Sequence, residues 1–360
     1  MRKNKLQKKG KIIISVILTL LILIIILAGI WAFPVHGEKS TEHWNSKMEY
    51  SSDYAINIEK DVDKDFEILA ISDTQLSDTA DLFGLVGNPL ETIEILINER
   101  KPDLIIVMGD VTWMMLTKIS VKQFVNFMDS FNIPWAPIMG NHEDEKEQGY
   151  PCSVDLNWVA DEFSKSKSCL FRKGPNNIGG VGNYVINITE NGKILKSLIL
   201  MDSHAGRIYP ECNNEIKYDY LYDSQLDWYE WVINGNKTLN NGKDVESMLF
   251  IHIPLQEYDA AYNAWQASGF DPNMGFGEKN EPCCPGYLNS GMFDLIKRLG
   301  STKHVFAAHD HKNNFSVNYQ GIQLTYTMKT GDRCSHKNGL TGGTRITIGK
   351  DVTINHIYVD

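Results

Sequence analysis

Short apolar runs alternate with amphipathic segments through the middle of the chain. The runs that are rich in β-forming residues are FEILAIS (66–72), DLIIVMG (103–109) and IPWAPIMG (133–140). The segments between them, 89–100 and 118–131, carry apolar residues at helical spacing. A strand–helix–strand–helix–strand order is typical of a parallel sheet with right-handed crossovers. We therefore predict an α/β domain.

The second half of the chain predicts more strands, one helix and two hairpins. A loop-rich segment, 141–182, separates it from the first half. The helix is expected at 223–234 with Ser224 as its N-cap, because a serine hydroxyl can satisfy a free N–H of the first turn. The other expected elements are strands at 183–188, 194–201, 247–254 and 303–309, and hairpins that turn at Gln320-Gly321 and Gly349-Lys350.

The N-terminal segment differs from the rest of the chain. Residues 1–11 carry six positive charges and no acidic residue, and residues 12–33 are uncharged and mostly apolar. A helix of this second length is about 33 Å long, enough to cross a bilayer. We predict a cytoplasmic basic tail at 1–11 and an uncleaved transmembrane signal-anchor at 12–33. A cleaved signal peptide is the alternative, although its apolar core is usually only about 7–15 residues long.

The remainder of the chain is expected outside the cytoplasm, attached to the cell membrane by a single pass. Residues 34–64 are polar and irregular and are interpreted as a stalk, and residues 65–360 as one domain. The chain has a net charge of −10 and the basic tail contributes +6, which leaves −16 for the rest. Such an acidic domain should repel nucleic acid, so no nucleic-acid partner is expected.

All six cysteines lie in this expected external part of the chain. In an oxidising compartment an even number of cysteines suggests disulfides. Their spacing shows no CxxC zinc pattern, and the sequence leaves the pairing open. The six are Cys152, Cys169, Cys212, Cys283, Cys284 and Cys334.

Each predicted core strand ends in polar residues that packing alone would not require. A single Asp or His at such a place is usually a turn former or a core residue, so only the whole set points to chemistry. In open α/β sheets ligands bind at the carboxyl ends of the strands. Residues two apart in an extended segment face the same side, which pairs Asp73 with Gln75 and His309 with His311. The other strand-end residues are Asp110, Asn141, His142 and His252.

This combination of carboxylates, amides and imidazoles suits divalent metal ions. Oxygen and nitrogen donors without thiolate are typical of sites for Mn, Fe or Zn. Two such ions about 3.5–4 Å apart share a carboxylate and clamp a phosphate during in-line displacement. We therefore predict two divalent metal ions as cofactors and a phosphate ester as substrate.

The order of these residues resembles the calcineurin-like metallophosphoesterases, whose pattern is D-x-H, GD, GNH[D/E], a lone His and GHxH. The chain reads Asp73-x-Gln75, Gly109-Asp110, Gly140-Asn141-His142-Glu143, His252 and Ala308-His309-Asp310-His311. The resemblance covers about residues 65–330, and it implies a four-layer αββα sandwich of two mixed β-sheets flanked by helices.

The resemblance also implies a role for each residue of the pattern. A water that bridges the two metals would attack phosphorus, and His142 would protonate the leaving group. Asp110 would bridge the metals, and Glu143 would orient the His142 imidazole. The implied ligands are Asp73, Gln75, Asp110 and His311 for the first ion, and Asp110, Asn141, His252 and His309 for the second.

Two departures from the pattern change the expected chemistry. Gln75 replaces the usual histidine, and an amide oxygen is a weaker donor than an imidazole. Trp113 stands in GDVTW where purple acid phosphatases have an iron-bound tyrosine, so a tyrosinate-bound ferric site is not expected. The later segment HIPLQEY…GFGEKNEPCCPGYLNSGMFD…HDHKNNF still resembles the purple-acid-phosphatase-like phosphatases that lack this tyrosine, and the chain is identified as closest to that group.

The sequence favours a membrane-anchored phosphoesterase that hydrolyses monoesters, with diester hydrolysis at the same site as the alternative. A non-catalytic surface binding protein with the same fold is a third interpretation, which would predict lost ligands or a lost proton donor. His204 and Arg207 are candidate substrate contacts, although solvated loop positions would also explain them.

Overall fold

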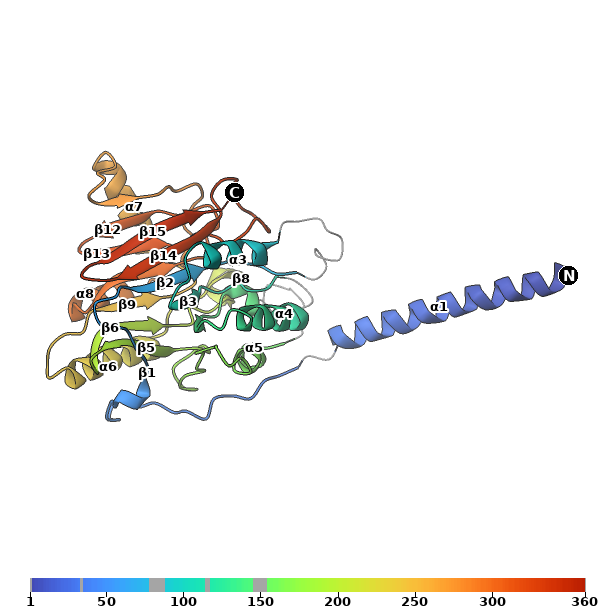
Figure 1. The fold of residues 1–360 in the computed structure, drawn as a ribbon, viewed down its shortest axis with the longest axis horizontal. Coiled ribbons are helices and arrows are strands. Elements are labelled where there is room, and N and C mark those ends of the chain that lie inside the picture. Colours follow the sequence, from blue (N-terminus) through green and yellow to red (C-terminus); the bar gives the residue numbers. More distant parts are fainter. Residues whose placement is uncertain (1, 33–34, 78–87, 114–116, 145–153, 360) are drawn as a thin grey trace.

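Two mixed β-sheets form the centre of the protein in a computed structural model (Figure 1). The structure describes residues 2–32, 35–77, 88–113, 117–144 and 154–359. One sheet has five strands and the other has eight, and a separate two-stranded hairpin is attached to them. The α/β fold with mixed sheets agrees with the expectation from the sequence.

The five-stranded sheet has the order β15-β14-β2-β3-β4. β2, β3 and the edge strand β4 are parallel to one another, as the alternating pattern predicts. β14 and β15 form an antiparallel hairpin on β2, with the expected turn at Gly349-Lys350. The bounds are β2 (Phe66–Ile71), β3 (Leu104–Val107), β4 (Trp135–Pro137), β14 (Gly342–Ile348) and β15 (Val352–Tyr358).

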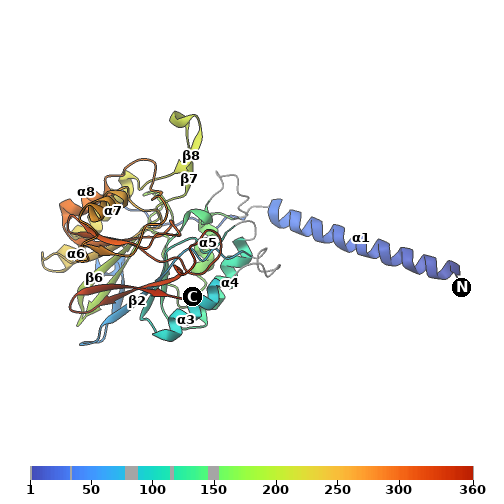
Figure 2. The same cartoon turned by 90° about the horizontal axis from the view of Figure 1, so that it is seen from above.

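The eight-stranded sheet has the order β1-β5-β6-β9-β11-β13-β12-β10. β12 and β13 form the hairpin expected at Gln320-Gly321. The bounds are β1 (Ile56–Glu59), β5 (Tyr184–Glu190), β6 (Lys193–Leu200), β9 (Ser247–Phe250), β10 (Gly275–Phe276), β11 (Thr302–Ala307), β12 (Ser316–Tyr319) and β13 (Ile322–Tyr326). A hairpin absent from the prediction, β7 (Gly206–Tyr209) and β8 (Glu215–Tyr218), projects from this side of the body (Figure 2).

Helices cover the outer face of each sheet, which gives the four-layer arrangement (Figure 2). One buried apolar cluster lies between the sheets and under α3, α4 and α5, and another lies under α6, α7 and α8. The sequence does not predict α5, α7 or α8. The helices are α3 (Pro89–Glu99), α4 (Thr117–Asp129) and α5 (Leu156–Phe163) on one side, and α6 (Asp223–Leu239), α7 (Glu257–Ala267) and α8 (Met292–Leu299) on the other.

The predicted N-cap of α6 is wrong by two residues. Tyr222 is the N-cap, and the Gln225 side chain accepts a hydrogen bond from the Tyr222 N–H. The Ser224 hydroxyl instead donates to the Ile178 carbonyl at 2.7 Å, which ties the helix to the preceding loop. A serine near a helix start can therefore serve tertiary packing rather than capping.

The segment 34–64, interpreted from sequence as a stalk, is instead packed on the domain where it is described. Strand β1 pairs in parallel with β5 over four residues. Trp44 and Tyr50 are 7% exposed and join the apolar cluster beneath α6. The sequence does not reveal this because the buried residues are isolated, with exposed or half-buried residues between them; they are Trp44, Tyr50, Ala55 and Lys60.

The N-terminal helix α1 (Arg2–Ala32) extends away from the rest of the chain (Figure 1). Among the described residues, no helix is both long enough and apolar enough to cross a membrane. The transmembrane segment expected at 12–33 is thus not supported, and its last residue, Phe33, lies outside the described residues.

The described cysteines do not form the disulfides that an even count suggested. Cys169, Cys212, Cys283, Cys284 and Cys334 are free thiols, and Cys152 lies outside the described residues.

Candidate metal centre

The polar residues that end five core strands meet at one edge of the two sheets. We call this set the strand-end cluster: Asp73, Gln75, Asp110, Asn141, His142, His252, His309 and His311. Donor atoms of Asp110, His252 and His309 lie within 4.8 Å of one another, and so do those of Asp73, Asp110 and His311. Asp110 belongs to both groups. The structure therefore brings together every residue that the sequence predicts as a metal ligand.

Asp110 lies at the middle of the strand-end cluster. Its Oδ2 is 3.3 Å from His252 Nε2 and 3.6 Å from His142 Nε2. Its Oδ1 accepts a hydrogen bond from the His142 N–H at 2.9 Å. One carboxylate oxygen is thus held by the backbone, and the other faces the imidazoles.

Two groups of donors flank Asp110. The first group is Asp73, Gln75 and His311, and the second group is Asn141, His252 and His309. In the second group, His252 Nε2 is 3.0 Å from Asn141 Oδ1, and its Nδ1 is held by the Met108 carbonyl at 2.7 Å. In the first group, His311 Nε2 is 3.4 Å from Asp73 Oδ1. The His311 Nδ1 is held by the Ser335 carbonyl at 2.7 Å. Carbonyls that fix one ring nitrogen leave the other directed into the cluster, an arrangement common among metal-ligating histidines.

The strand-end cluster fits a divalent metal. Asp73 Oδ1 and Asp110 Oδ2 are buried and have no hydrogen-bond partner. A buried carboxylate oxygen without a partner carries a large desolvation cost unless a cation compensates it. These oxygens and the imidazole nitrogens are hard and borderline donors, which suit Mn, Fe or Zn.

Backbone conformation at the strand ends directs the side chains into the cluster. Asp73, Gln75, Asp110 and His309 have φ angles of 52°, 48°, 50° and 75°, in the left-handed region that costs non-glycine residues energy. The loops also pass very close to each other. A Cβ on Gly140 would lie 2.2 Å from Asp110 Oδ1. Glycine is therefore required in the GNH motif for the loop to approach Asp110.

The buried charges shift one another's pKa values. Burial lowers the pKa of His252, but the neighbouring Asp110 charge outweighs it and raises that pKa to about 10. Burial and the charge of His252 lower the pKa of His309 to about 3. Burial raises the pKa of Asp73, yet the neighbouring His311 imidazole, 3.4 Å away, brings it down to about 2. The cluster thus keeps Asp73 ionised and favours the protonated form of His252 and the neutral form of His309.

Glu143 does not orient His142 as the sequence predicts. Its Oε1 accepts hydrogen bonds from the N–H groups of Val111 and Thr112, at 2.8 and 3.2 Å. Its Oε2 accepts from the N–H groups of Asp110 and Gly140, at 3.1 and 2.8 Å. This fully buried carboxylate therefore clamps the two loops that carry Asp110 and His142.

We expect Glu143→Gln to lower the free energy of unfolding by about 3 kcal/mol, because an amide NH₂ would face two N–H donors that now share a carboxylate oxygen. Urea denaturation followed by circular dichroism would measure this. Glu94→Gln, on the exposed face of α3, is the matched control and should change stability by less than about 0.5 kcal/mol. An equal and small effect of both substitutions would contradict the clamp.

Lys329 lies beside the cluster, and no motif of the sequence predicts it there. It is 1% exposed, and its Nζ donates to Asp73 O at 2.6 Å and to Gln75 Oε1 at 2.9 Å. It lies beside Ser72 in an isolated parallel bridge that extends β2. The signal in the sequence is that Lys329 directly follows the β-forming run LTYTM, so that its side chain is expected to be buried with its strand.

The two residues predicted to contact substrate have partners outside the strand-end cluster. The His204 ring stacks on Tyr222 with centroids 4.3 Å apart, and its Nε2 is 2.7 Å from Gln225 Oε1. Arg207 lies on β7 with its side chain half-exposed, 3.9 Å from Asp219. Tyr218 on β8 is closer to the cluster, with its ring 4.4 Å from that of His309. The β7–β8 hairpin therefore borders the metal centre through Tyr218.

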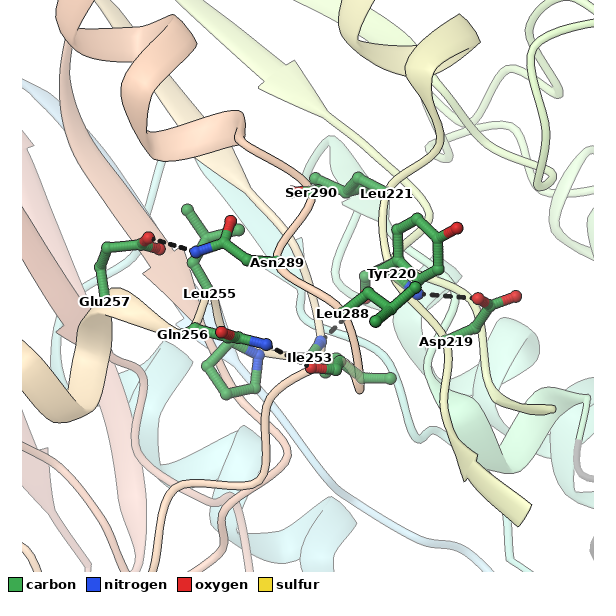
Figure 3. Close-up of a pocket in the computed structure, with 13 residues that line it drawn as sticks. Asp219, Tyr220, Leu221, Ile253, Leu255, Gln256, Glu257, Leu288, Asn289 and Ser290 are labelled. Carbon is green, nitrogen blue, oxygen red and sulfur yellow. Dashed lines mark hydrogen bonds between the residues drawn. The ribbon is translucent and has the colours of Figure 1, made fainter. Parts of the chain in front are cut away.

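A pocket lies beside the strand-end cluster, between the segment before α6 and the segment after β9 (Figure 3). Ile253, which follows His252 in the chain, is part of its wall. Ser203, another wall residue, accepts hydrogen bonds from the N–H groups of His252 and Ile253 at 3.2 and 2.8 Å. No side chain of the cluster lines this pocket, so we assign it no part in the chemistry.

Comparison with known proteins also relates this chain to phosphoesterases. A sequence model of calcineurin-like phosphoesterases matches residues 66–313, a range that contains the whole strand-end cluster. The chain is 27% identical to "Probable inactive purple acid phosphatase 14" of Arabidopsis thaliana, over 78% of this chain and 73% of that protein. It is 29% identical to "Phosphatase DCR2" of Saccharomyces cerevisiae, over 62% of this chain and 38% of that protein.

Solved structures include a dimetal phosphatase from Danio rerio, which superposes with a TM-score of 0.49 at 11% identity. That superposition covers 81% of this chain and 95% of the other.

Proposed function

Because this chain belongs to the calcineurin-like phosphoesterase family, we propose that it hydrolyses phosphate esters at the strand-end cluster. The observation that carries the proposal is the pair of buried, unpartnered oxygens, Asp73 Oδ1 and Asp110 Oδ2, faced by imidazoles from three other loops. Buried carboxylate oxygens without a hydrogen-bond partner favour a bound cation.

The proposed assignment gives each side chain a distinct task. Asp110, Asn141, His252 and His309 would hold one divalent ion, and Asp73, Asp110 and His311 surround the place of the other. Divalent ions, when bound, would supply positive charge for the phosphate and lower the pKa of water. The hydrogen bonds of Glu143 hold the loops after β3 and β4 together, which keeps Asp110 and Asn141 in position.

His142 is the proposed general acid for the leaving group. Its backbone N–H is bound to Asp110 Oδ1, and its side chain is 16% exposed, so that it borders the cluster on the solvent side. A group placed there can reach the ester oxygen of a phosphate that binds at the cluster.

We expect His142→Ala to lower kcat about 10²-fold for alkyl phosphates, whose leaving groups need a proton. The loss should be much smaller for 4-nitrophenyl phosphate, whose leaving group departs as an anion. Steady-state kinetics with both substrates would show the difference, with metal content and the exposed-residue variant His43→Ala as controls. An equal loss for both substrates would contradict the proton-donor role.

A second candidate function is a non-catalytic, metal-binding protein with the same fold. Two observations favour it: the word "inactive" in the names of several relatives, and the engagement of Gln75 by Lys329. His142 and the shared Asp110 are both present, which supports catalysis. We therefore retain hydrolysis as the proposal, with monoesters preferred over diesters. The extracytoplasmic location and the absence of nucleic-acid partners stay predictions from the sequence.

The deciding experiment is turnover by the full chain after chelation and re-addition of Mn²⁺, Zn²⁺ or Fe²⁺. An aryl phosphate monoester and the corresponding diester would be compared. We expect metal-dependent hydrolysis with a higher kcat/KM for the monoester. Tight metal binding without turnover of either ester would support the non-catalytic alternative, and faster diester turnover would reverse the substrate preference.

A further inference from the structure

Lys329 connects two residues that the family pattern assigns to the first metal. Its Nζ donates to the Asp73 carbonyl and to the Gln75 side-chain oxygen, at 2.6 and 2.9 Å. The other end of the Gln75 amide, Nε2, lies 3.1 Å from His311 Nε2. The Gln75 side chain therefore bridges a buried lysine and an imidazole of the first group.

The lysine fixes which end of the Gln75 amide faces the cluster. An amide binds a metal through its oxygen, because its NH₂ group has no lone pair to donate. The opposite orientation would place the NH₂ group against the lysine amino group, with donors facing donors. Gln75 thus turns its only metal-binding atom toward Lys329 and presents N–H groups to the ligands.

The amino group of the same lysine lies against the first group. Lys329 is 1% exposed, and its Nζ donates to an oxygen of each of the two motif residues, Asp73 and Gln75. The Gln75 oxygen therefore already has a buried donor as its partner, which a metal ion would have to displace.

The second group keeps all of its donors. His252 Nε2 lies 3.0 Å from Asn141 Oδ1 and 3.3 Å from Asp110 Oδ2. The His309 ring packs edge-on against His252, with centroids 5.2 Å apart. The two halves of the cluster therefore differ in their capacity for a cation.

We infer that Lys329 withdraws Gln75 from the first group, so that the chain binds one divalent ion tightly in the second group and a second ion at least tenfold more weakly. This inference rests on the proposed metal centre and not on turnover. The tenfold figure is the lower end of the about 10–100-fold effects seen when a group next to a metal ligand is changed.

Calorimetric titration of the chelated full chain with Mn²⁺ alone tests the inference on the unaltered protein. We expect one tight equivalent and a separate weak one. Electron paramagnetic resonance at one equivalent should show the spectrum of an isolated Mn²⁺ ion. A spin-coupled pair at low occupancy, or two equivalents of equal affinity, would overturn the inference.

Two variants test the role of the lysine itself. Lys329→Met removes the amino group, and the double variant Gln75→His with Lys329→Met also restores an imidazole. We expect the second equivalent to bind about 10–100-fold more tightly in the double variant, while the tight equivalent is unchanged. Lys303→Met, at an exposed position of β11, is the control and should change neither. If the double variant leaves the weak equivalent weak, the inference is wrong.

Failure of this inference can be distinguished from failure of the proposed function. A protein that binds no Mn²⁺ at all would overturn both. A protein with two equal equivalents would overturn only the role of Lys329. His252→Ala should abolish the tight equivalent and leave the weak one in place; retention of the tight equivalent would contradict its assignment to the second group.

Discussion

Asp110→Asn is expected to lower phosphate-ester turnover by at least about 10²–10³-fold, the largest effect of any single substitution in this chain. Asp110 is the one residue shared by both donor groups, and its Oδ2 is buried without a hydrogen-bond partner. An asparagine keeps the shape but removes the negative charge that would attract two cations. It can also present an NH₂ group where an acceptor is required.

The test compares kcat/KM, metal content and thermal stability of the variant with those of the unaltered chain. Metal content should fall together with turnover, while the fold is retained, because asparagine has nearly the same volume and its Oδ1 can still accept the hydrogen bond from the His142 N–H. Turnover within tenfold of the unaltered protein would contradict the central place of Asp110.

Asp310→Asn is a matched control from the same stretch of sequence. Asp310 stands between His309 and His311, but its Oδ2 accepts hydrogen bonds from Tyr326 and from the Cys284 N–H, away from the cluster. We expect its turnover to stay within about tenfold of the unaltered chain. An equal loss in both variants would mean that any buried carboxylate of this region matters for structure alone.

Removal of residues 35–60 is expected to destabilise the domain by about 5 kcal/mol, although the sequence reads as a stalk. Trp44 and Tyr50 are nearly fully buried, and burial of each such side chain contributes about 1.5–3 kcal/mol. The Tyr54 hydroxyl accepts a hydrogen bond from Trp228 Nε1 at 2.7 Å. Loss of β1 would also expose the edge of β5. Because domains are stable by only about 5–15 kcal/mol, much of the shortened protein should unfold.

Chemical denaturation of a chain that begins at residue 35 and of one that begins at residue 61 measures this difference. A smaller, better controlled comparison is Trp44→Ala against Met48→Ala, since Met48 is 39% exposed. We expect Trp44→Ala to cost about 3 kcal/mol and Met48→Ala less than about 0.5 kcal/mol. Equal stability of the two shortened chains would restore the stalk interpretation.

The position of the strand-end cluster was predictable because each of its residues follows a continuous apolar strand. The carboxyl ends of such strands meet at one edge of a sheet, so Asp73, Asp110 and His252 could be placed together from sequence position alone. The parallel order of β2, β3 and β4 followed from the same alternation of strands and helices. The hairpins at Gln320-Gly321 and Gly349-Lys350 followed from turn residues.

Contacts between residues far apart in the chain were not predictable. Lys329 lies 256 residues from Asp73, and no local pattern links them. Glu143 is next to His142 in sequence, but its side-chain direction depends on the loop after β3, which supplies three of its donors. The segment around Trp44 looks irregular because its partners, among them α6, come more than a hundred residues later. Tertiary packing decides each of these cases.

The most direct test of the account is anomalous diffraction from crystals of the full chain soaked in Mn²⁺ or Zn²⁺. We expect a strong peak in contact with Asp110, His252 and His309, and a weaker one beside Asp73 and His311. Absence of any peak at the Asp110 carboxylate under saturating metal would contradict the claim that this buried cluster is a metal centre.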